Sequence, residues 1–362
     1  MFRHIPKHFF SSCSSFYDII ISGAGPAGAS LACALSLSPL FSSTNPSILL
    51  LDHMKAESID SLKVEGSMKN VIGDHRVVTL TPGSMRFINS LNLSSHLEQK
   101  RITPVRRMQV WESSSDGYFI IDSEKNGEKE TLAYTIEIKH IQAALMEKIK
   151  ELGRVKLGIP DSIEEIDYSD EKEVRVKLKQ GGWVGGKLVV GSDGKNSKVK
   201  QAANIPTYGW PYHQMGMVCT IQADRHLTAT AFQRYLPNGL IALLPLWEDY
   251  YSIVWTVNLE EFDYLSKLDD VDFIKELNKV LTISSSKPSL FPPVPGIVVD
   301  AVNGIANGAL RIVDTVLGRK GESKKKMNSF FPLMQVNFSF NLFFPITLTF
   351  KIYFPFVNCS FY

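Results

Sequence analysis

Apolar and polar residues occur in blocks that predict alternating strands and helices over the first part of the chain. An apolar run at 19–21 precedes a glycine cluster and then an uncharged, alanine-rich segment of helical composition that extends to Leu37. A second apolar run at 48–51 follows a loop rich in serine, asparagine and proline. Between 137 and 150, apolar residues recur at helical spacing. This order of strand, helix and strand predicts an α/β unit built on parallel strands.

From residue 163 onward the pattern predicts mainly strands. Apolar and charged residues alternate at 174–178, a further strand ends at Val190, and four more strand candidates lie within 214–257. The segment 240–247 is almost wholly apolar, which fits either a buried core strand or the wall of an apolar substrate cavity. A helix is predicted over 260–281. The chain therefore combines an α/β unit with a β-rich region.

The glycine cluster after the first strand has the spacing of a dinucleotide-binding turn. Gly23, Gly25 and Gly28 form a G-x-G-x-x-G pattern between the predicted strand and helix. The first glycine permits the turn, the second lets a pyrophosphate approach the backbone, and the third lets helix and strand pack closely. The helix N-terminus offers free N–H groups to the phosphates. A glycine turn that serves packing alone is the alternative interpretation.

Two acidic residues stand where predicted strands end. Asp52 follows the second strand, 24 residues beyond Gly28, where a dinucleotide fold places an acid that accepts hydrogen bonds from a ribose hydroxyl. An exposed strand-end carboxylate is the alternative. Asp193 and Gly194 follow the strand that ends at Val190 and precede a predicted helix. Open α/β sheets bind ligands at the carboxyl ends of their strands, so both acids are candidate ligand contacts.

Charge and cysteine content exclude several functions. The net charge is +2 and charged residues make up 21% of the chain, which gives no indication of nucleic-acid binding. The four cysteines lie far apart and form no C-x-x-C pair. We therefore expect neither a metal site nor a disulfide framework. We also expect the protein to reside in a reducing compartment.

The two ends of the chain differ from the rest in composition. Residues 1–16 are basic and serine-rich and contain no acid, which is typical of a mitochondrial transit peptide. Of the 21 phenylalanines, ten fall within 330–361. The stretch 330–350 is uncharged and long enough to cross a bilayer, but glutamine, asparagine and proline interrupt it. We interpret 316–362 as an atypical tail outside the fold, with a membrane anchor as the alternative.

Several segments together resemble a known family, the FAD-dependent aromatic-ring monooxygenases. They are YDIIISGAGPAGASLACAL, RVVTLTPGSMRFI, RRMQVWE, LVVGSDGKNSKVKQAANI and RYLPNGLIALLPL. MQVW and IALLPL are similar to the ubiquinone-biosynthesis branch. The resemblance implies a Rossmann-like FAD-binding domain interleaved with a β-sheet substrate domain. The implied boundaries are 17–112 and 137–205 for the first domain, and 113–136 and 206–300 for the second.

The resemblance also implies roles for individual residues. Gly23, Gly25 and Gly28 match the pyrophosphate turn for FAD, and Asp52 matches the acid on the adenosine ribose. Arg76 is similar to an arginine that lies against the flavin; from composition alone it faces either an anionic cofactor or solvent. Asp193 and Gly194 match the second FAD motif, in which Lys200 replaces the family's arginine.

The activity implied by the resemblance is hydroxylation of an aromatic ring. The substrate is a polyprenylated 4-hydroxybenzoate-type intermediate of ubiquinone biosynthesis, and O₂ reacts through a flavin hydroperoxide. The implied electron donor is of ferredoxin type. The implied location is the matrix side of the mitochondrial inner membrane, with peripheral membrane association and a multiprotein ubiquinone-biosynthesis complex as partner.

The chain departs from the family pattern at two places. Ile138 stands where the family usually has asparagine, and the family's third FAD motif, Gly-Asp-Ala-Ala-His, does not occur after residue 315. The second departure leaves an alternative, a truncated and catalytically inactive chain that retains FAD or partner binding. A further alternative from the glycine turn alone is a nicotinamide-dependent oxidoreductase.

Overall fold

The computed structural model describes residues 13–42, 44–54, 76–97, 101–115, 117–123, 131–170, 173–223 and 229–282. These residues form two compact units. The first contains the described residues of 13–54, 89–97 and 140–208, and the second those of 76–88, 101–139 and 209–282.

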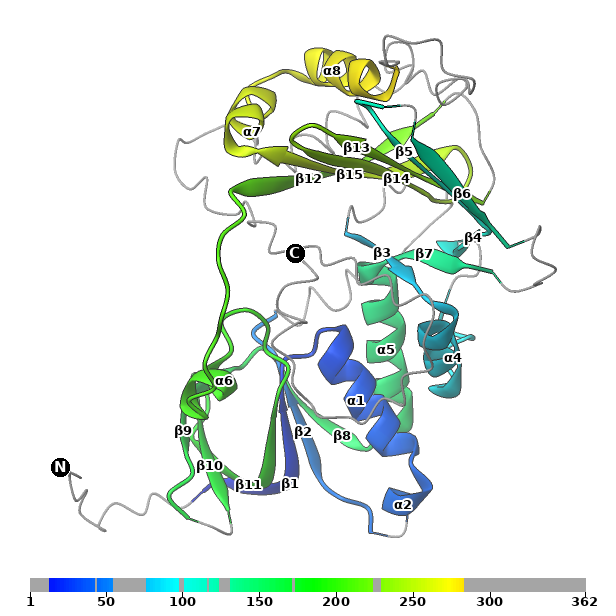
Figure 1. The fold of residues 1–362 in the computed structure, drawn as a ribbon. Helices are drawn as coiled ribbons and strands as arrows, with labels where there is room; N and C mark the ends of the chain where they lie inside the picture. Colours follow the sequence, from blue (N-terminus) through cyan, green and yellow to red (C-terminus); the bar gives the residue numbers. More distant parts are fainter. Residues whose placement is uncertain are drawn as a thin grey trace. The chain divides into compact units, whose positions relative to one another are not determined.

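The first unit is built on a six-stranded sheet in which four parallel strands stand side by side (Figure 1). Its order is β8 (Val155–Gly158), β2 (Ile48–Leu51), β1 (Ser15–Ser22), β11 (Trp183–Gly191), β10 (Val174–Leu178) and β9 (Ile163–Asp167). The first four strands run parallel, and β10 and β9 are antiparallel to their neighbours. All four residues of β2 are buried, as expected for an apolar run in the middle of a covered parallel sheet.

Helices α1 and α5 of the first unit follow the pattern that the sequence predicts, whereas α2 lies in the segment predicted as a loop. Helix α1 (Pro26–Leu37) begins directly after the glycine turn, with Gly25 as its N-cap and proline at its first position, where the missing N–H costs nothing. Helix α5 (Ile138–Leu152) buries its apolar stripe and belongs to this unit from His140 onward. The short helices α2 (Pro39–Ser42) and α6 (Lys198–Ala202) follow α1 and β11.

The second unit contains a larger, mainly antiparallel sheet. Its order is β12 (Gln214–Gln222), β15 (Tyr250–Asn258), β14 (Gly239–Pro245), β13 (Thr230–Leu236), β5 (Arg107–Glu112) and β6 (Tyr118–Asp122). A smaller sheet has the order β3 (Val77–Leu80), β7 (Ala133–Glu137) and β4 (Thr103–Val105). Helix α4 (Pro82–Ser90) follows β3.

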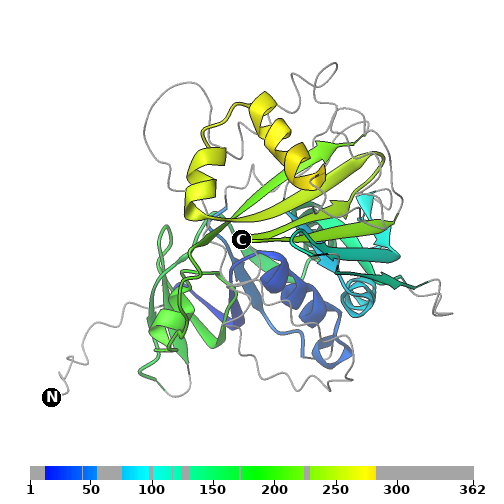
Figure 2. The same cartoon turned by 45° about the horizontal axis from the view of Figure 1, so that its top comes forward.

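One face of the larger sheet is covered by two helices (Figure 2). Helices α7 (Leu259–Leu265) and α8 (Asp270–Thr282) pack on it, and Asn258 caps α7 with a capping box. Alternate residues of the strands form the core beneath them, including Ile241 and Leu243 of β14. The core interpretation of 240–247 therefore holds for one face of this strand, because its alternate residues point to the opposite face.

A buried ion pair lies in the second unit near the smaller sheet. Arg101 and Glu137 are 1% and 3% exposed, and the guanidinium donates two hydrogen bonds of 2.7 and 2.8 Å to the carboxylate. The guanidinium carbon also lies 3.8 Å from the ring centroid of Trp247, just beyond β14. Thr135 of β7 donates a hydrogen bond to the carbonyl of Pro245. These contacts join the smaller sheet to the end of β14.

The predicted fold class, α/β with a Rossmann-like domain and a β-sheet domain, is confirmed. Strand β5 pairs with β13, which lies more than 100 residues further along the chain, and 107–112 belongs to the second unit. One detail differs from the sequence prediction. The single helix predicted over 260–281 is two helices, α7 and α8.

The predicted transit peptide and tail lie mostly outside the described residues. Of 1–16, only 13–16 are described, and β1 already begins at Ser15. The segment 316–362 is wholly outside. Among the helices of the described part of the chain, none is long and apolar enough to span a membrane.

Candidate functional site

The glycine turn after β1 is held in a conformation that only glycine adopts readily. Gly23 has a φ of +100°, and a Cβ there would overlap the carbonyl of Ser192 and lie 2.9 Å from the Cα of Asp193. A Cβ on Gly28 would overlap the carbonyl oxygen of Gly23 and lie 3.1 Å from its carbon. The first and third glycines therefore let the turn pack against the segment that contains Asp193.

Gly25 differs from the other two glycines because the space beside it is open. A Cβ there would meet no atom within 4 Å, and its φ of −64° is ordinary. Ala29 donates the first helical hydrogen bond, to the carbonyl of Gly25. The N–H groups of Ala27 and Gly28 precede that bond, so they have no acceptor within the helix. Open space thus adjoins free donors at the positive end of the α1 dipole.

Asp52 lies at the carboxyl end of β2, and its carboxylate holds the turn. One oxygen accepts a 2.7 Å hydrogen bond from the N–H of Ala24, and the other accepts a 2.8 Å hydrogen bond from the N–H of Met54. The residue is 9% exposed, so the alternative of a freely exposed strand-end carboxylate is wrong. His53, the next residue, is 89% exposed and lies 3.4 Å from the same carboxylate.

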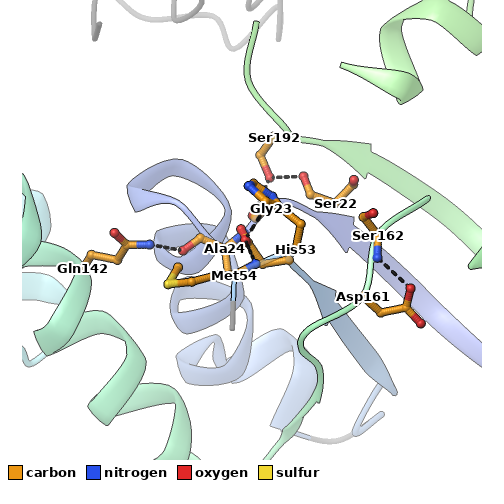
Figure 3. A network of polar contacts seen from close by, with 10 residues as sticks. Ser22, Gly23, Ala24, His53, Met54, Gln142, Asp161, Ser162 and Ser192 are labelled. Atoms are coloured by element: carbon orange, nitrogen blue, oxygen red, sulfur yellow. Dashed lines mark hydrogen bonds and ion pairs between the residues drawn. The ribbon is translucent and has the colours of Figure 1, made fainter. Parts of the chain in front are cut away.

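Two side chains that the sequence did not single out complete this polar network (Figure 3). Gln142 of α5 donates a 3.1 Å hydrogen bond to the carbonyl of Ala24 and is 7% exposed. Ser192 Oγ lies 2.8 and 3.0 Å from the carbonyls of Ser22 and Gly23. The sequence could have indicated a buried role for Gln142, because this polar residue lies within the apolar stripe of an amphipathic helix. Ser192 had none beyond its place before Asp193.

The second motif adjoins the turn through Ser192. One oxygen of Asp193 accepts a 2.8 Å hydrogen bond from the N–H of Lys198, and the other, Oδ1, is buried and has no partner among the described residues. Gly194 has a φ of +79°. Lys200 donates a 2.8 Å hydrogen bond to Thr207 Oγ1. Oδ1 of Asp193 is thus a buried acceptor that no described residue satisfies.

The predicted site residues divide between the two units. The three glycines, Asp52, Asp193 and Gly194 come together in the first unit. Arg76 belongs to the second unit, where it is exposed, directly precedes β3 and accepts a hydrogen bond from the N–H of Ile138 at its carbonyl. Within the described residues, no cluster of three or more histidine, cysteine or acidic side chains could hold a metal ion.

Solved structures define the class of this fold. The p-nitrophenol 4-monooxygenase PnpA from Pseudomonas putida DLL-E4 has a TM-score of 0.54 at 14% identity, over 76% of this chain and 65% of that one. The flavin-dependent monooxygenase PieE, solved with FAD and substrate, has a TM-score of 0.54 at 15% identity, over 74% of this chain and 47% of that one. The chain therefore has the fold of the FAD-dependent monooxygenases.

Curated proteins give a more specific relationship. The mitochondrial ubiquinone biosynthesis monooxygenase COQ6 of Danio rerio is 31% identical over 277 residues, 74% of this chain and 55% of that protein. Its counterpart in Caenorhabditis elegans is 32% identical over 274 residues, 75% of this chain and 58% of that protein. These relatives confirm the resemblance to the ubiquinone-biosynthesis branch. No protein-family model matches the chain. The chain spans 55–60% of the length of the first relatives that it matches.

Proposed function

We propose that the first unit binds FAD, with the pyrophosphate at the glycine turn. The observation that carries the proposal is the contrast within the turn. Backbone atoms crowd the space beside Gly23 and Gly28, whereas the space beside Gly25 is open. The N–H groups that follow Gly25 at the start of α1 have no acceptor within the helix. An anionic group at a helix N-terminus is favoured by those donors and by the helix dipole.

Other polar groups of the first unit fit the remainder of the cofactor. Each oxygen of Asp52 accepts one backbone hydrogen bond and has a second lone pair with which to accept from the adenosine ribose. The unpartnered Asp193 Oδ1 accepts from a further hydroxyl of the cofactor. Arg76 is assigned to the flavin by the family resemblance. On this proposal the first unit is the cofactor domain and the second the substrate domain.

We further propose that the chain derives from, and acts as, a flavin-dependent hydroxylase of ubiquinone biosynthesis. The substrate class is a polyprenylated 4-hydroxybenzoate-type ring. When bound, FAD supplies the activation of O₂, because none of the twenty side chains does so. The chain's own residues bind the pyrophosphate, orient the ribose and keep the turn rigid. The names of the relatives support this proposal over a nicotinamide-dependent oxidoreductase.

Location and partners follow from the same relationship as proposals. The relatives are named mitochondrial, and residues 1–16 have the composition of a transit peptide. We propose action at the matrix side of the inner membrane with peripheral membrane association. A ferredoxin-type electron donor and a ubiquinone-biosynthesis complex are the proposed partners.

The test uses the purified full chain, titrated with FAD while flavin fluorescence is followed, and in parallel with NADPH. Saturable, one-to-one FAD binding is the expected result, with no comparable binding of NADPH. The FAD-loaded chain is then supplied with a ferredoxin reduction system, O₂ and a prenylated 4-hydroxybenzoate, and the hydroxylated ring is measured by mass spectrometry. Failure to bind FAD refutes the cofactor proposal. FAD binding without product identifies the inactive alternative instead.

A further inference from the structure

Asp52, the acid at the end of β2, lies one residue beyond the last paired residue of its strand. The parallel pairing of β2 with β8 ends at Leu51, opposite Gly158. Beyond it, the N–H of Asp52 donates to the carbonyl of Gly158 over 3.4 Å, and the carbonyl of Asp52 accepts from the N–H of Asp161 over 2.8 Å. A distance of 3.4 Å is long for an N–H···O bond, so the contact with Asp161 is the stronger of the two.

The side chain of Asp161 fixes the position of that N–H group. Its Oδ1 accepts hydrogen bonds of 2.7 and 3.0 Å from the N–H groups of Ser162 and Gln180, the first of which is drawn in Figure 3. Gln180 lies in the turn between β10 and β11, where the N–H of Lys179 also donates to the carbonyl of Ser162. Two hydrogen bonds therefore join the segment between β8 and β9 to this turn, and one of them depends on the carboxylate of Asp161.

The carboxylate of Asp161 faces the protein rather than the open space at the glycine turn. Its second oxygen, Oδ2, lies beside Gly181, where an added Cβ would be 3.4 Å away. The side chain thus acts on its own backbone and on the β10–β11 turn, and its backbone acts on Asp52. A carboxylate that must accept from a bound hydroxyl works only within a few tenths of an ångström of the right place, so the groups that hold its backbone affect its affinity for the ligand.

We propose that Asp161 is a positioning residue for the cofactor, which holds Asp52 where it accepts hydrogen bonds from the adenosine ribose. The inference rests on the proposed function, which it deepens by naming a residue that acts on the ribose end of the site without touching the ligand. Its effect should therefore be confined to ligands that carry ribose hydroxyls.

The test measures the binding of ADP and of 2′,3′-dideoxy-ADP by the purified full chain, each in competition with FAD while flavin fluorescence is followed. The two nucleotides differ only in the ribose hydroxyls. Asp161→Ala removes both hydrogen bonds that the side chain accepts. We expect this variant to bind ADP roughly 3- to 10-fold more weakly, the value of about one hydrogen bond, and the dideoxy nucleotide with a change of less than about 2-fold.

Two further variants separate positioning from stability. Asp161→Asn keeps a side-chain oxygen that accepts from the same N–H groups, so it should restore the affinity for ADP to within about 2-fold of the original. Asp167→Ala is the matched control, because Asp167 stands at the far end of β9 and accepts a 3.0 Å hydrogen bond from the N–H of Ser169. It should change the binding of either nucleotide less than about 2-fold.

A double variant tests whether Asp161 acts through Asp52. Adding Asp161→Ala to Asp52→Asn should weaken ADP binding no further than Asp52→Asn alone, because the group that Asp161 positions has already been changed. If Asp161→Ala does not fold, Asp161→Glu takes its place, because the longer side chain moves the carboxylate away from the two N–H groups.

Three results overturn the inference: equal weakening of ADP and the dideoxy nucleotide, additive losses in the double variant, or an Asp161→Asn chain as weak as Asp161→Ala. Unchanged ADP binding by Asp161→Ala, in a chain that takes up FAD, overturns it and leaves the cofactor proposal intact. If the original chain binds neither FAD nor ADP, the cofactor proposal itself fails and the inference fails with it.

Discussion

Substituting Gly25 by alanine separates ligand binding from folding at the glycine turn. The added Cβ meets no protein atom within 4 Å, and the backbone at φ −64° and ψ 178° accepts alanine without strain. The only new occupant of the open space is therefore the methyl group itself. If a pyrophosphate approaches the backbone there, the methyl group excludes it.

The expected change in stability is small because two effects oppose each other. Alanine is a poorer N-cap than glycine, by an amount on the order of 0.5–1 kcal/mol. Replacing glycine by alanine at a compatible backbone position stabilises by about 0.4–1 kcal/mol through the unfolded chain. The free energy of unfolding should therefore stay within about 1 kcal/mol of the original. FAD affinity should fall at least tenfold, which corresponds to about 1.4 kcal/mol.

Gly28→Ala is the matched variant with the opposite behaviour. Its Cβ overlaps the carbonyl oxygen of Gly23, a backbone atom that cannot rotate away. Helix α1 and the turn must separate, which costs about 1–3 kcal/mol or more. Urea unfolding, followed by far-ultraviolet circular dichroism, measures the stability of both variants, and quenching of flavin fluorescence measures their affinity for FAD.

Two results would refute this reasoning. If Gly25→Ala binds FAD as tightly as the original chain, the open space is not where the pyrophosphate lies. If Gly28→Ala is as stable as the original chain, the third glycine is not needed for close packing. If Gly25→Ala lost stability and Gly28→Ala did not, position 25 rather than position 28 would be the one that needs glycine for packing.

Three further predictions concern groups around the turn and the core. Gln142→Leu removes the amide donor to the turn and should weaken FAD binding several-fold, at a loss of about 1–2 kcal/mol in unfolding free energy. Arg101→Met should destabilise by about 3–5 kcal/mol in urea unfolding, and Arg101→Met with Glu137→Met should recover most of that loss. The hydrogen bond from Lys187 lowers the pKa of Asp18 to about 2. Its stabilisation is complete above the ordinary pKa near 4 and disappears toward pH 2, so Asp18→Asn should destabilise at pH 6 and have little effect at pH 2.

Local sequence signals were sufficient for β1, β2, α1 and α5 of the first unit, whereas β8 was not predicted and α2 lies in the predicted loop before β2. The apolar run of β2 is continuous because the strand is covered on both faces, and the stripe of α5 repeats at helical spacing because one side is buried. Gly23 and Gly28 are required by the close backbone packing of the turn, and together with Gly25 they give the recognisable G-x-G-x-x-G spacing. These features depend on neighbours within a few residues, so they can be predicted from the local sequence.

The remaining features depend on partners that are far away in the chain. Strand β5 pairs with β13 across more than 100 residues, so its membership of the second unit has no local sign. Gln142 meets Ala24 across 118 positions, and Ser192 meets Gly23 across 169. The sequence of β14 is almost wholly apolar and does not distinguish its two faces. The structure does, because Ile241 and Leu243 pack in the core beneath the helices. Patterns along the chain give the elements, whereas the register between elements decides which side chains meet.

The structure also separates the two interpretations that the glycine pattern allowed. A turn that serves packing alone needs glycine where atoms crowd the backbone, and Gly23 and Gly28 meet that condition against Ser192 and against each other. Packing gives no reason for glycine at position 25, where nothing lies within 4 Å and φ is ordinary. A glycine that the fold does not require, beside N–H groups without an acceptor in the helix, is what the proposed binding of a pyrophosphate at the backbone would need. Position 25 is therefore where the packing and binding interpretations give opposite expectations.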